Sequence, residues 1–309
     1  MALTLLEAAK LKSGEDIRQA VIAIYAQSSD LLRVLPFEDI QGNALRYNQE
    51  EALPGIAFRG VNGSWTPSTG VINPVTEPLV IAGGELDVDP FIVKTMGDNQ
   101  RAVQENMKIK AIAHNWTLKF FKGDSATTPA EFDGLQTRLV GNQLIADGST
   151  SGGDALSLAK LDEAIDAVSE PTHLVMNKTM RRRLTVASRT TSVGGDLQWE
   201  KDEFGKQIAV YNGLPIIIAD EDNTGAQILP FTEANPGGGS AASTSIYCLS
   251  LGEGKLQGIQ NGIPEVTDLG EIASSPVLRT RVEWYCGITL WHSKAASRLW
   301  GIKDAAVVV

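Results

Sequence analysis

Apolar and polar residues alternate without a break over residues 277–291, a run far longer than a typical strand of about 5–6 residues. Successive side chains of a strand point to opposite faces. One face of this run collects Leu278, Thr280, Val282, Trp284, Cys286, Ile288 and Leu290. The other collects Arg279, Arg281, Glu283, Tyr285, Thr289 and Trp291. The pattern predicts one long strand with an apolar and a polar face.

Residues 40–88 also alternate, but they are rich in Gly, Pro and Asn and contain few large apolar residues. The segments 44–49 and 56–59 lie on either side of a Leu-Pro-Gly sequence, which predicts a long two-stranded excursion with its turn near Pro54 and Gly55. An isolated hairpin is marginally stable in water, so this one needs a neighbour to lie on.

Helical spacing predicts a long helix over residues 98–121, ending at a basic turn and Gly123. Its apolar stripe consists of Val103, Met107, Ile112, Trp116 and Phe120. Nearer the N-terminus, a capping box at Ser13 predicts a helix, and an apolar cluster at 31–35 ends before Pro36.

The second half of the chain mixes short helices and short strands. The patterns predict helices at 160–168 and 178–188 and strands at 172–177, 211–220 and 245–250. A small mixed domain over about residues 155–275 follows from this order.

Composition narrows the function classes. The chain has 309 residues, of which 43% are hydrophobic and 21% charged, as in globular proteins. A net charge of −10 argues against a protein that wraps nucleic acid tightly. Neither a window of about 18–20 apolar residues nor a secretory signal is present, so we expect a cytoplasmic address and no membrane contact.

No motif for catalysis, cofactor binding or metal binding stands out. The histidines lack metal-ligand spacing and the cysteines lie in apolar runs, so we expect structural histidines and reduced, buried thiols. These residues are His114, His173, His292, Cys248 and Cys286. The glycines of 252–258 miss both phosphate-binding spacings. We therefore expect no catalytic residue, no cofactor and no enzyme.

Two charged clusters have a plainer interpretation. The acidic run 220–222 could hold a hard cation, but its spacing does not fit a calcium loop. The basic run 181–183 could touch DNA or a scaffold, although three consecutive helical positions spread around the helix. Solvated surface is the favoured interpretation of both.

The strand 279–287, Arg-Thr-Arg-Val-Glu-Trp-Tyr-Cys-Gly, resembles the C-terminal strand of tailed-phage major capsid proteins of the Hong Kong 97-type fold. Residues 211–217 resemble a strand of the axial domain of that family. The resemblance implies an α+β fold with four parts in order: an N-terminal arm (1–39), an extended loop (40–88), a peripheral domain with a spine helix (89–154 and 276–309) and an axial domain (155–275).

The family's function is then implied: hexamers and pentamers that tile an icosahedral virion shell around double-stranded DNA, assembled in the host cytoplasm. Expected partners are other copies of the chain, a portal, a decoration protein and weakly contacted DNA. The sequence shows no long, charged, coiled-coil-like N-terminal extension, so we expect either a separate scaffolding protein or a sequence that is already mature.

The resemblance also assigns roles to side chains. The apolar positions of the extended loop, Leu45, Tyr47, Ile56 and Phe58, are expected to be buried mainly against a neighbouring subunit. Trp284 is expected in the peripheral-domain core beneath the long helix, near Trp116 or Phe120.

One departure concerns lysine. The type member of the family cross-links its shell through a lysine on the extended loop, but this chain has none between Lys12 and Lys94. The loop offers only Arg46 and Arg59, whose guanidinium groups stay protonated and cannot attack an amide. We predict a shell without isopeptide bonds.

Two alternatives remain at this point. An encapsulin-like bacterial nanocompartment shell shares the fold and encloses protein cargo rather than DNA. An unrelated cytoplasmic α+β enzyme is the other, which megadalton particles in size-exclusion chromatography would disfavour.

Overall fold

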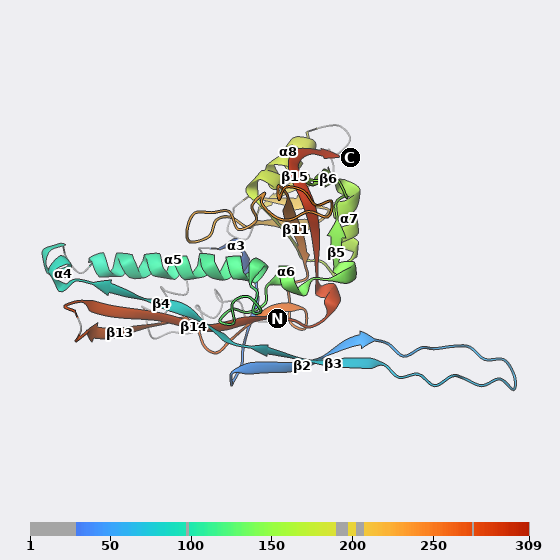
Figure 1. Ribbon diagram of the computed structural model, residues 1–309, viewed down its shortest axis with the longest axis horizontal. Helices are drawn as coiled ribbons and strands as arrows, with labels where there is room; N and C mark the ends of the chain where they lie inside the picture. Colours follow the sequence, from blue (N-terminus) through green and yellow to red (C-terminus); the bar gives the residue numbers. More distant parts are fainter. Residues whose placement is uncertain (1–28, 97–98, 190–196, 202–206, 274, 309) are drawn as a thin grey trace.

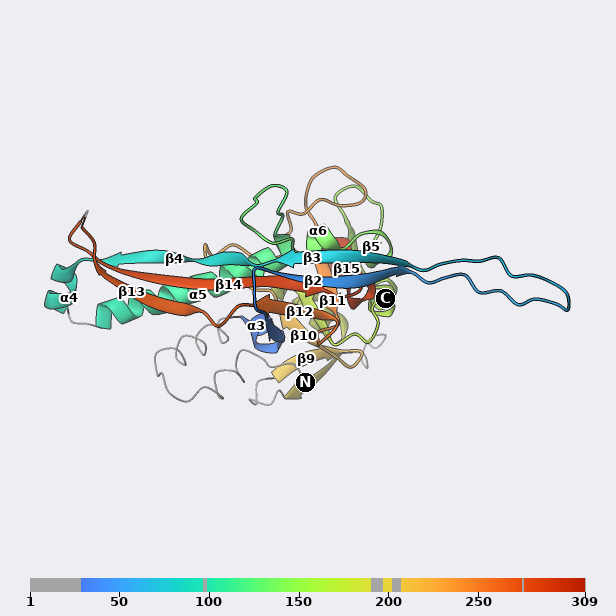
Figure 2. The same ribbon diagram turned by 90° about the horizontal axis from the view of Figure 1, so that it is seen from below.

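The computed structural model describes residues 29–96, 99–189, 197–201, 207–273 and 275–308. The protein has three parts (Figure 1): a long ribbon of strands covered by one helix, a compact body, and a hairpin that projects beyond the body. Seen from below, the ribbon extends to one side of the body and the hairpin to the other (Figure 2).

The ribbon is a five-stranded sheet ordered β1-β12-β14-β13, in which β4 also pairs with β14. Its strands are β1 (Phe37–Asp39), β4 (Val80–Val88), β12 (Leu256–Gln260), β13 (Glu265–Glu271) and β14 (Leu278–Leu290). Helix α5 (Asn99–Lys122) runs along one face, and α4 (Pro90–Met96) lies at the far end. The long alternating strand is thus confirmed, and it is the central strand of its sheet.

The body is an eight-stranded sheet ordered β5-β15-β11-β7-β10-β9-β8, with β6 on β15. Its strands are β5 (Leu144–Ala146), β6 (Asp154–Ser157), β7 (His173–Met176), β8 (Leu197–Lys201), β9 (Gln207–Tyr211), β10 (Leu214–Ile218), β11 (Thr244–Leu249) and β15 (Ala296–Val308). Helices α7 (Leu158–Asp166) and α8 (Lys178–Ala187) cover one face. The other face joins the core beneath α5, so β11 is buried over its whole length.

The hairpin consists of β2 (Ala44–Ala52) and β3 (Val71–Pro78). The expected turn near Pro54 and Gly55 is wrong. The chain instead reverses at residues 60–63, where Gly63 N–H donates to Gly60 C=O at 3.1 Å and Asn62 has a φ of 65°. This left-handed conformation suits Asn, which tolerates it better than most residues do.

The expected boundaries also need correction. Strand β4, assigned to the extended loop, pairs along the ribbon with β14. Strands β12 and β13, assigned to the 155–275 domain, pair with β14 as well. Strand β15 and β5, assigned to the other domain, belong to the body sheet. Pairing between strands distant in sequence decides which sheet a strand joins, and local alternation does not predict that pairing.

The helices near the core agree with the sequence patterns, with one difference. The predicted long helix is confirmed as α5, but the first half of its stripe, Val103 and Met107, is exposed. Within the expected N-terminal arm, α3 (Asp30–Val34) buries Leu31 and Leu32 and belongs to the core. The helix predicted after Ser13 lies outside the described residues.

Candidate functional site: the projecting hairpin and its root

Strand pairing gives the hairpin two distinct faces near the body. Leu45 lies opposite Glu77, and Tyr47 lies opposite Val75. Directly opposed residues of an antiparallel pair share a face. All four are buried or half-buried, whereas residues on the other face, such as Arg46, are exposed. The first face therefore packs against other parts of the same chain.

Tyr47 corrects the expectation that it packs mainly on a neighbour, because its side chain is only 6% exposed within a single subunit. Its hydroxyl donates to the Leu290 C=O at 2.9 Å, and its ring centroid lies 4.7 Å from that of Trp291. Burial, reinforced by the charge of Glu77, raises the pKa of the Tyr47 hydroxyl to about 12. Tyr47 stays a neutral hydrogen-bond donor at the root.

A largely buried ion pair joins the hairpin to the short helix α6 (Leu135–Arg138). Arg138 approaches Glu77 in a bidentate manner, with one guanidinium nitrogen on Oε1 and Nη2 2.7 Å from Oε2. Bidentate arginine–carboxylate pairs fix direction as well as distance. Sequence reasoning missed this pair, since a single acid in β3 and a single arginine 61 residues later give no local signal.

The outer part of the hairpin has no such support. Every residue from 53 to 70 is exposed. Ile56 is 91% exposed and Phe58 104%, and Leu53, Val61 and Trp65 are also largely exposed. Soluble monomers rarely expose a contiguous group of large apolar side chains without a partner to cover it. The structure therefore separates the four predicted interface residues: Tyr47 packs inside the chain, Leu45 is half-buried, and Ile56 and Phe58 are free.

The tip nevertheless has internal order. Trp65 Nε1–H donates to the Ala57 C=O at 2.9 Å, and the Ser68 hydroxyl donates to the Gly55 C=O at 2.8 Å. The Arg59 guanidinium lies 4.4 Å from the centroid of the Trp65 ring, a cation–π contact. These contacts hold the two chain segments together so that the apolar side chains are displayed on a formed surface.

An aromatic cluster holds α5 onto the ribbon. The Trp116 ring centroid lies 5.8 Å from Trp284 and 5.5 Å from Phe120. Phe37 of β1 closes the group at 5.4 Å from Trp284. Trp284 is 1% exposed, and its Nε1–H donates to Gln260 Oε1 at 3.2 Å. The three residues expected in this core thus lie together beneath the long helix.

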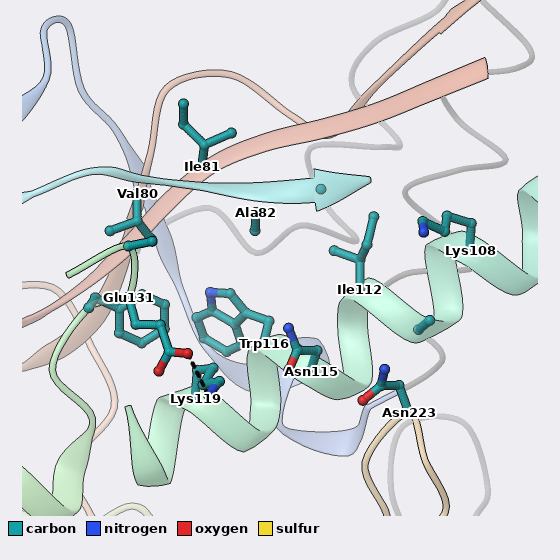
Figure 3. A pocket seen from close by; sticks show the side chains of 14 residues that line it. Val80, Ile81, Ala82, Lys108, Ile112, Asn115, Trp116, Lys119, Glu131 and Asn223 are labelled. Carbon is teal, nitrogen blue, oxygen red and sulfur yellow. Dashed lines mark ion pairs between the residues drawn. The ribbon is translucent and has the colours of Figure 1, made fainter. Parts of the chain in front are cut away.

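A cavity of about 180 Å³ opens beside this cluster, between α5 and β4 (Figure 3). Val80, Ala82, Ile112 and Trp116 form its apolar wall. Its rim is polar and includes Asn115, Asn223 and the Lys119–Glu131 ion pair, whose Nζ and Oε1 are 2.6 Å apart. Lys108 also lines the cavity, and the Glu131 carboxylate is engaged by Lys119.

The histidine and cysteine side chains considered for chemistry include three that are buried or half-buried in the body or the ribbon: His173, Cys248 and Cys286. Burial lowers the pKa of His173 to about 4, so its ring is neutral at pH 7. Cys248 and Cys286 are buried free thiols whose pKa is raised by burial. Within the described residues, no group of three or more His, Cys, Asp or Glu could hold a metal ion, and no helix is long and apolar enough to cross a membrane.

Neither a family model nor a curated protein matches the sequence. Solved structures do match. The holo-SrpI encapsulin complex from Synechococcus elongatus PCC 7942 superposes with a TM-score of 0.66 at 17% identity, over 100% of this chain and 99% of that chain. The capsid of a native GTA particle superposes with a TM-score of 0.62 at 15% identity, over 89% and 90% of the two chains.

The chain has the Hong Kong 97-type fold. Mycobacterium phage Bobi provides a further similar structure, with a TM-score of 0.60 at 13% identity over 90% of this chain and 91% of that chain. Identities this low speak for the fold alone. The predicted α+β capsid-type fold is confirmed.

Proposed function

We propose that this chain is the major capsid protein of a tailed phage, which self-assembles as hexamers and pentamers into an icosahedral shell around double-stranded DNA. The main support is the uncovered hairpin tip, where Ile56 and Phe58 project from an ordered segment without any cover from their own chain. A second copy of the chain supplies that cover.

The shape of the molecule favours repeated association. Hairpin and ribbon extend to opposite sides of the body (Figure 2), so one copy's hairpin can lie on another copy while its own ribbon accepts a third. Contacts between unlike surfaces of identical subunits generate rings when the rotation closes. Rings of six and five then tile a closed shell from many modest interfaces.

In this proposal the three parts take the family's roles. The hairpin is the extended loop, the ribbon with α5 is the peripheral domain with its spine helix, and the body is the axial domain. A separate scaffolding protein, a portal and a decoration protein are the expected partners. A net charge of −10 suits a wall that contacts the packaged DNA only weakly.

A second candidate is an encapsulin-like shell around protein cargo. It is favoured by one observation: the similarity to the SrpI encapsulin spans essentially the whole of both chains. The two candidates share self-assembly and differ in what the shell encloses.

The contents of native particles distinguish the two. Particles captured from their source with an antibody to this chain are treated with nuclease and then opened with denaturant. We expect protected double-stranded DNA of uniform length. A stoichiometric protein cargo without DNA would favour the nanocompartment, and elution of the native protein as a small species would refute both shell functions and revive the enzyme alternative.

A further inference from the structure

The direction of the hairpin is not fixed by sheet hydrogen bonds. Strand β3 ends at Pro78 and β4 begins at Val80, so Leu79 alone joins the hairpin to the ribbon along that line. On the other side, Gly42 has a φ of 112°, which favours glycine, just before β2. Within the described residues, β2 and β3 pair only with each other. Side chains at the root must therefore hold the angle.

Arg138 makes one of these contacts, and its guanidinium group is held firmly in place. Its Nε–H donates to the Asp133 C=O at 2.7 Å while its two terminal nitrogens bind Glu77. The helix that carries it is anchored by Leu135, which is fully buried, and by the Thr137 hydroxyl on the Gly123 C=O at 3.0 Å. A guanidinium held at three nitrogens has little freedom to follow a moving hairpin.

Tyr47 supplies the second contact on the same face of the hairpin. It binds the end of β14 through the Leu290 C=O and stacks on Trp291. Its hydroxyl also lies 3.5 Å from Glu77 Oε1, so the two contacts are adjacent. Together they connect β2 and β3 to two separate elements, β14 and α6, which restrains both the tilt and the rotation of the hairpin.

We propose that Glu77, Arg138 and Tyr47 form a clamp that sets the direction in which the hairpin projects, and that they are positioning residues for assembly. This inference rests on the proposed shell function. Fourteen residues separate Gly63 from Glu77, which spans about 46 Å at about 3.3 Å per residue. A rotation of about 5° at the root therefore moves the tip by about 4 Å over that length, more than the distance between touching atoms.

The test removes the clamp without leaving a lone buried charge. Glu77→Met with Arg138→Met replaces the ion pair by apolar side chains, a change that is often neutral for stability. Glu85→Met with Arg281→Met is the matched control, because it removes an arginine–glutamate pair from the exposed face of the ribbon. A second clamp variant, Arg138→Lys, keeps the charge and loses the fork.

Two readouts follow. Spin labels at Ser64→Cys on the tip and Asp166→Cys on α7 report the tip-to-body distance, because both native cysteines are buried; labelled protein is diluted with unlabelled protein. We expect a narrow distribution in the parent and the control, a wide one in the Met pair and an intermediate one in Arg138→Lys. Electron microscopy should show uniform particles for the parent and irregular or open ones for the Met pair.

The outcomes separate the two claims. If the parent forms no particles, the shell function fails, while the distance distributions still test the clamp. A Met pair with the parent's distance distribution and uniform particles would overturn the clamp. If the Met pair does not fold, Arg138→Lys decides, because a distribution as narrow as the parent's would equally overturn it.

Discussion

The ribbon and the projecting hairpin, which join at Leu79, differ in how far the chain covers its own strands. After Leu79, β4 lies in the ribbon, where α5 and the aromatic cluster cover one face and Trp284 is sealed from solvent. Before it, β3 belongs to a hairpin whose outer part has no cover at all. Both regions are extended backbone, and they differ in whether the chain's own side chains cover them. Where they do not, the proposed shell supplies the cover from a second copy.

Mutations in the covered ribbon should act on the stability of the fold. Trp284→Ala removes the centre of the aromatic cluster and the hydrogen bond to Gln260, and truncation of a buried Trp typically costs about 3–5 kcal/mol of unfolding free energy. We expect insoluble protein, or a urea midpoint far below that of the parent. Arg281→Ala is the control, since an exposed ion pair contributes about 1 kcal/mol or less. Equal solubility of the two variants would mean that the faces of β14 are wrongly assigned.

In the body, we expect His173 to have an intermediate effect on the free energy of unfolding, and this effect depends on pH. Burial lowers the folded-state pKa of His173 from 6.5 to about 4, so the unfolded chain takes up its proton first. Stability from this group is complete above pH 6.5 and declines as the pH falls toward 4, by about 1–2 kcal/mol at pH 5.

Urea unfolding of the parent and of His173→Gln at pH 7 and pH 5 checks this sign. The variant should lose less stability on acidification than the parent does. The raised pKa of Asp147, about 6 because of burial, acts in the opposite direction but is common to both proteins and cancels. A larger acid loss in the variant would contradict the assignment.

The uncovered hairpin tip should respond through assembly alone. Ile56→Ser with Phe58→Ser changes two exposed side chains, so the unfolding free energy should stay within about 0.5 kcal/mol of the parent. Size-exclusion chromatography should nevertheless show loss of particles. Ser64→Ala with Thr66→Ala changes exposed polar residues of the same tip and should assemble normally. Normal particle yield from the Ser variant would show that the tip needs no cover.

No covalent bond is expected to reinforce that cover. The described hairpin offers arginine but no lysine, and an arginine does not form an amide with asparagine or glutamine. Mature particles boiled in detergent with reductant should give a single band near 33.1 kDa. A ladder of covalent oligomers would contradict this.

Local patterns predicted much of the fold. The alternation of 277–291 predicted β14 almost to its ends, and helical spacing predicted α5, because both depend on neighbours within a few residues. The partition of strands between sheets was wrong, since β14 and β15 are adjacent in sequence and lie in different sheets. No local signal distinguishes them, because the last residues of β14 and residues 296–302 of β15 are buried or half-buried on both faces.

The candidate site was only partly predictable. Alternation identified Leu45, Tyr47, Ile56 and Phe58 as apolar positions of one excursion, but it could not distinguish root from tip. That difference comes from two partners distant in sequence. Leu290 and Arg138 bind the root of the hairpin, so its side chains there are buried within the chain. Only the three-dimensional structure brings them together.

A cryo-electron microscopy reconstruction of the purified, unmodified protein shows directly whether a second copy covers the hairpin tip. We expect a closed shell in which residues 53–70 of every copy lie against another copy, with Ile56 and Phe58 buried in that contact. A protein that stays monomeric at high concentration, or a shell in which these residues project freely into solvent, would contradict this expectation.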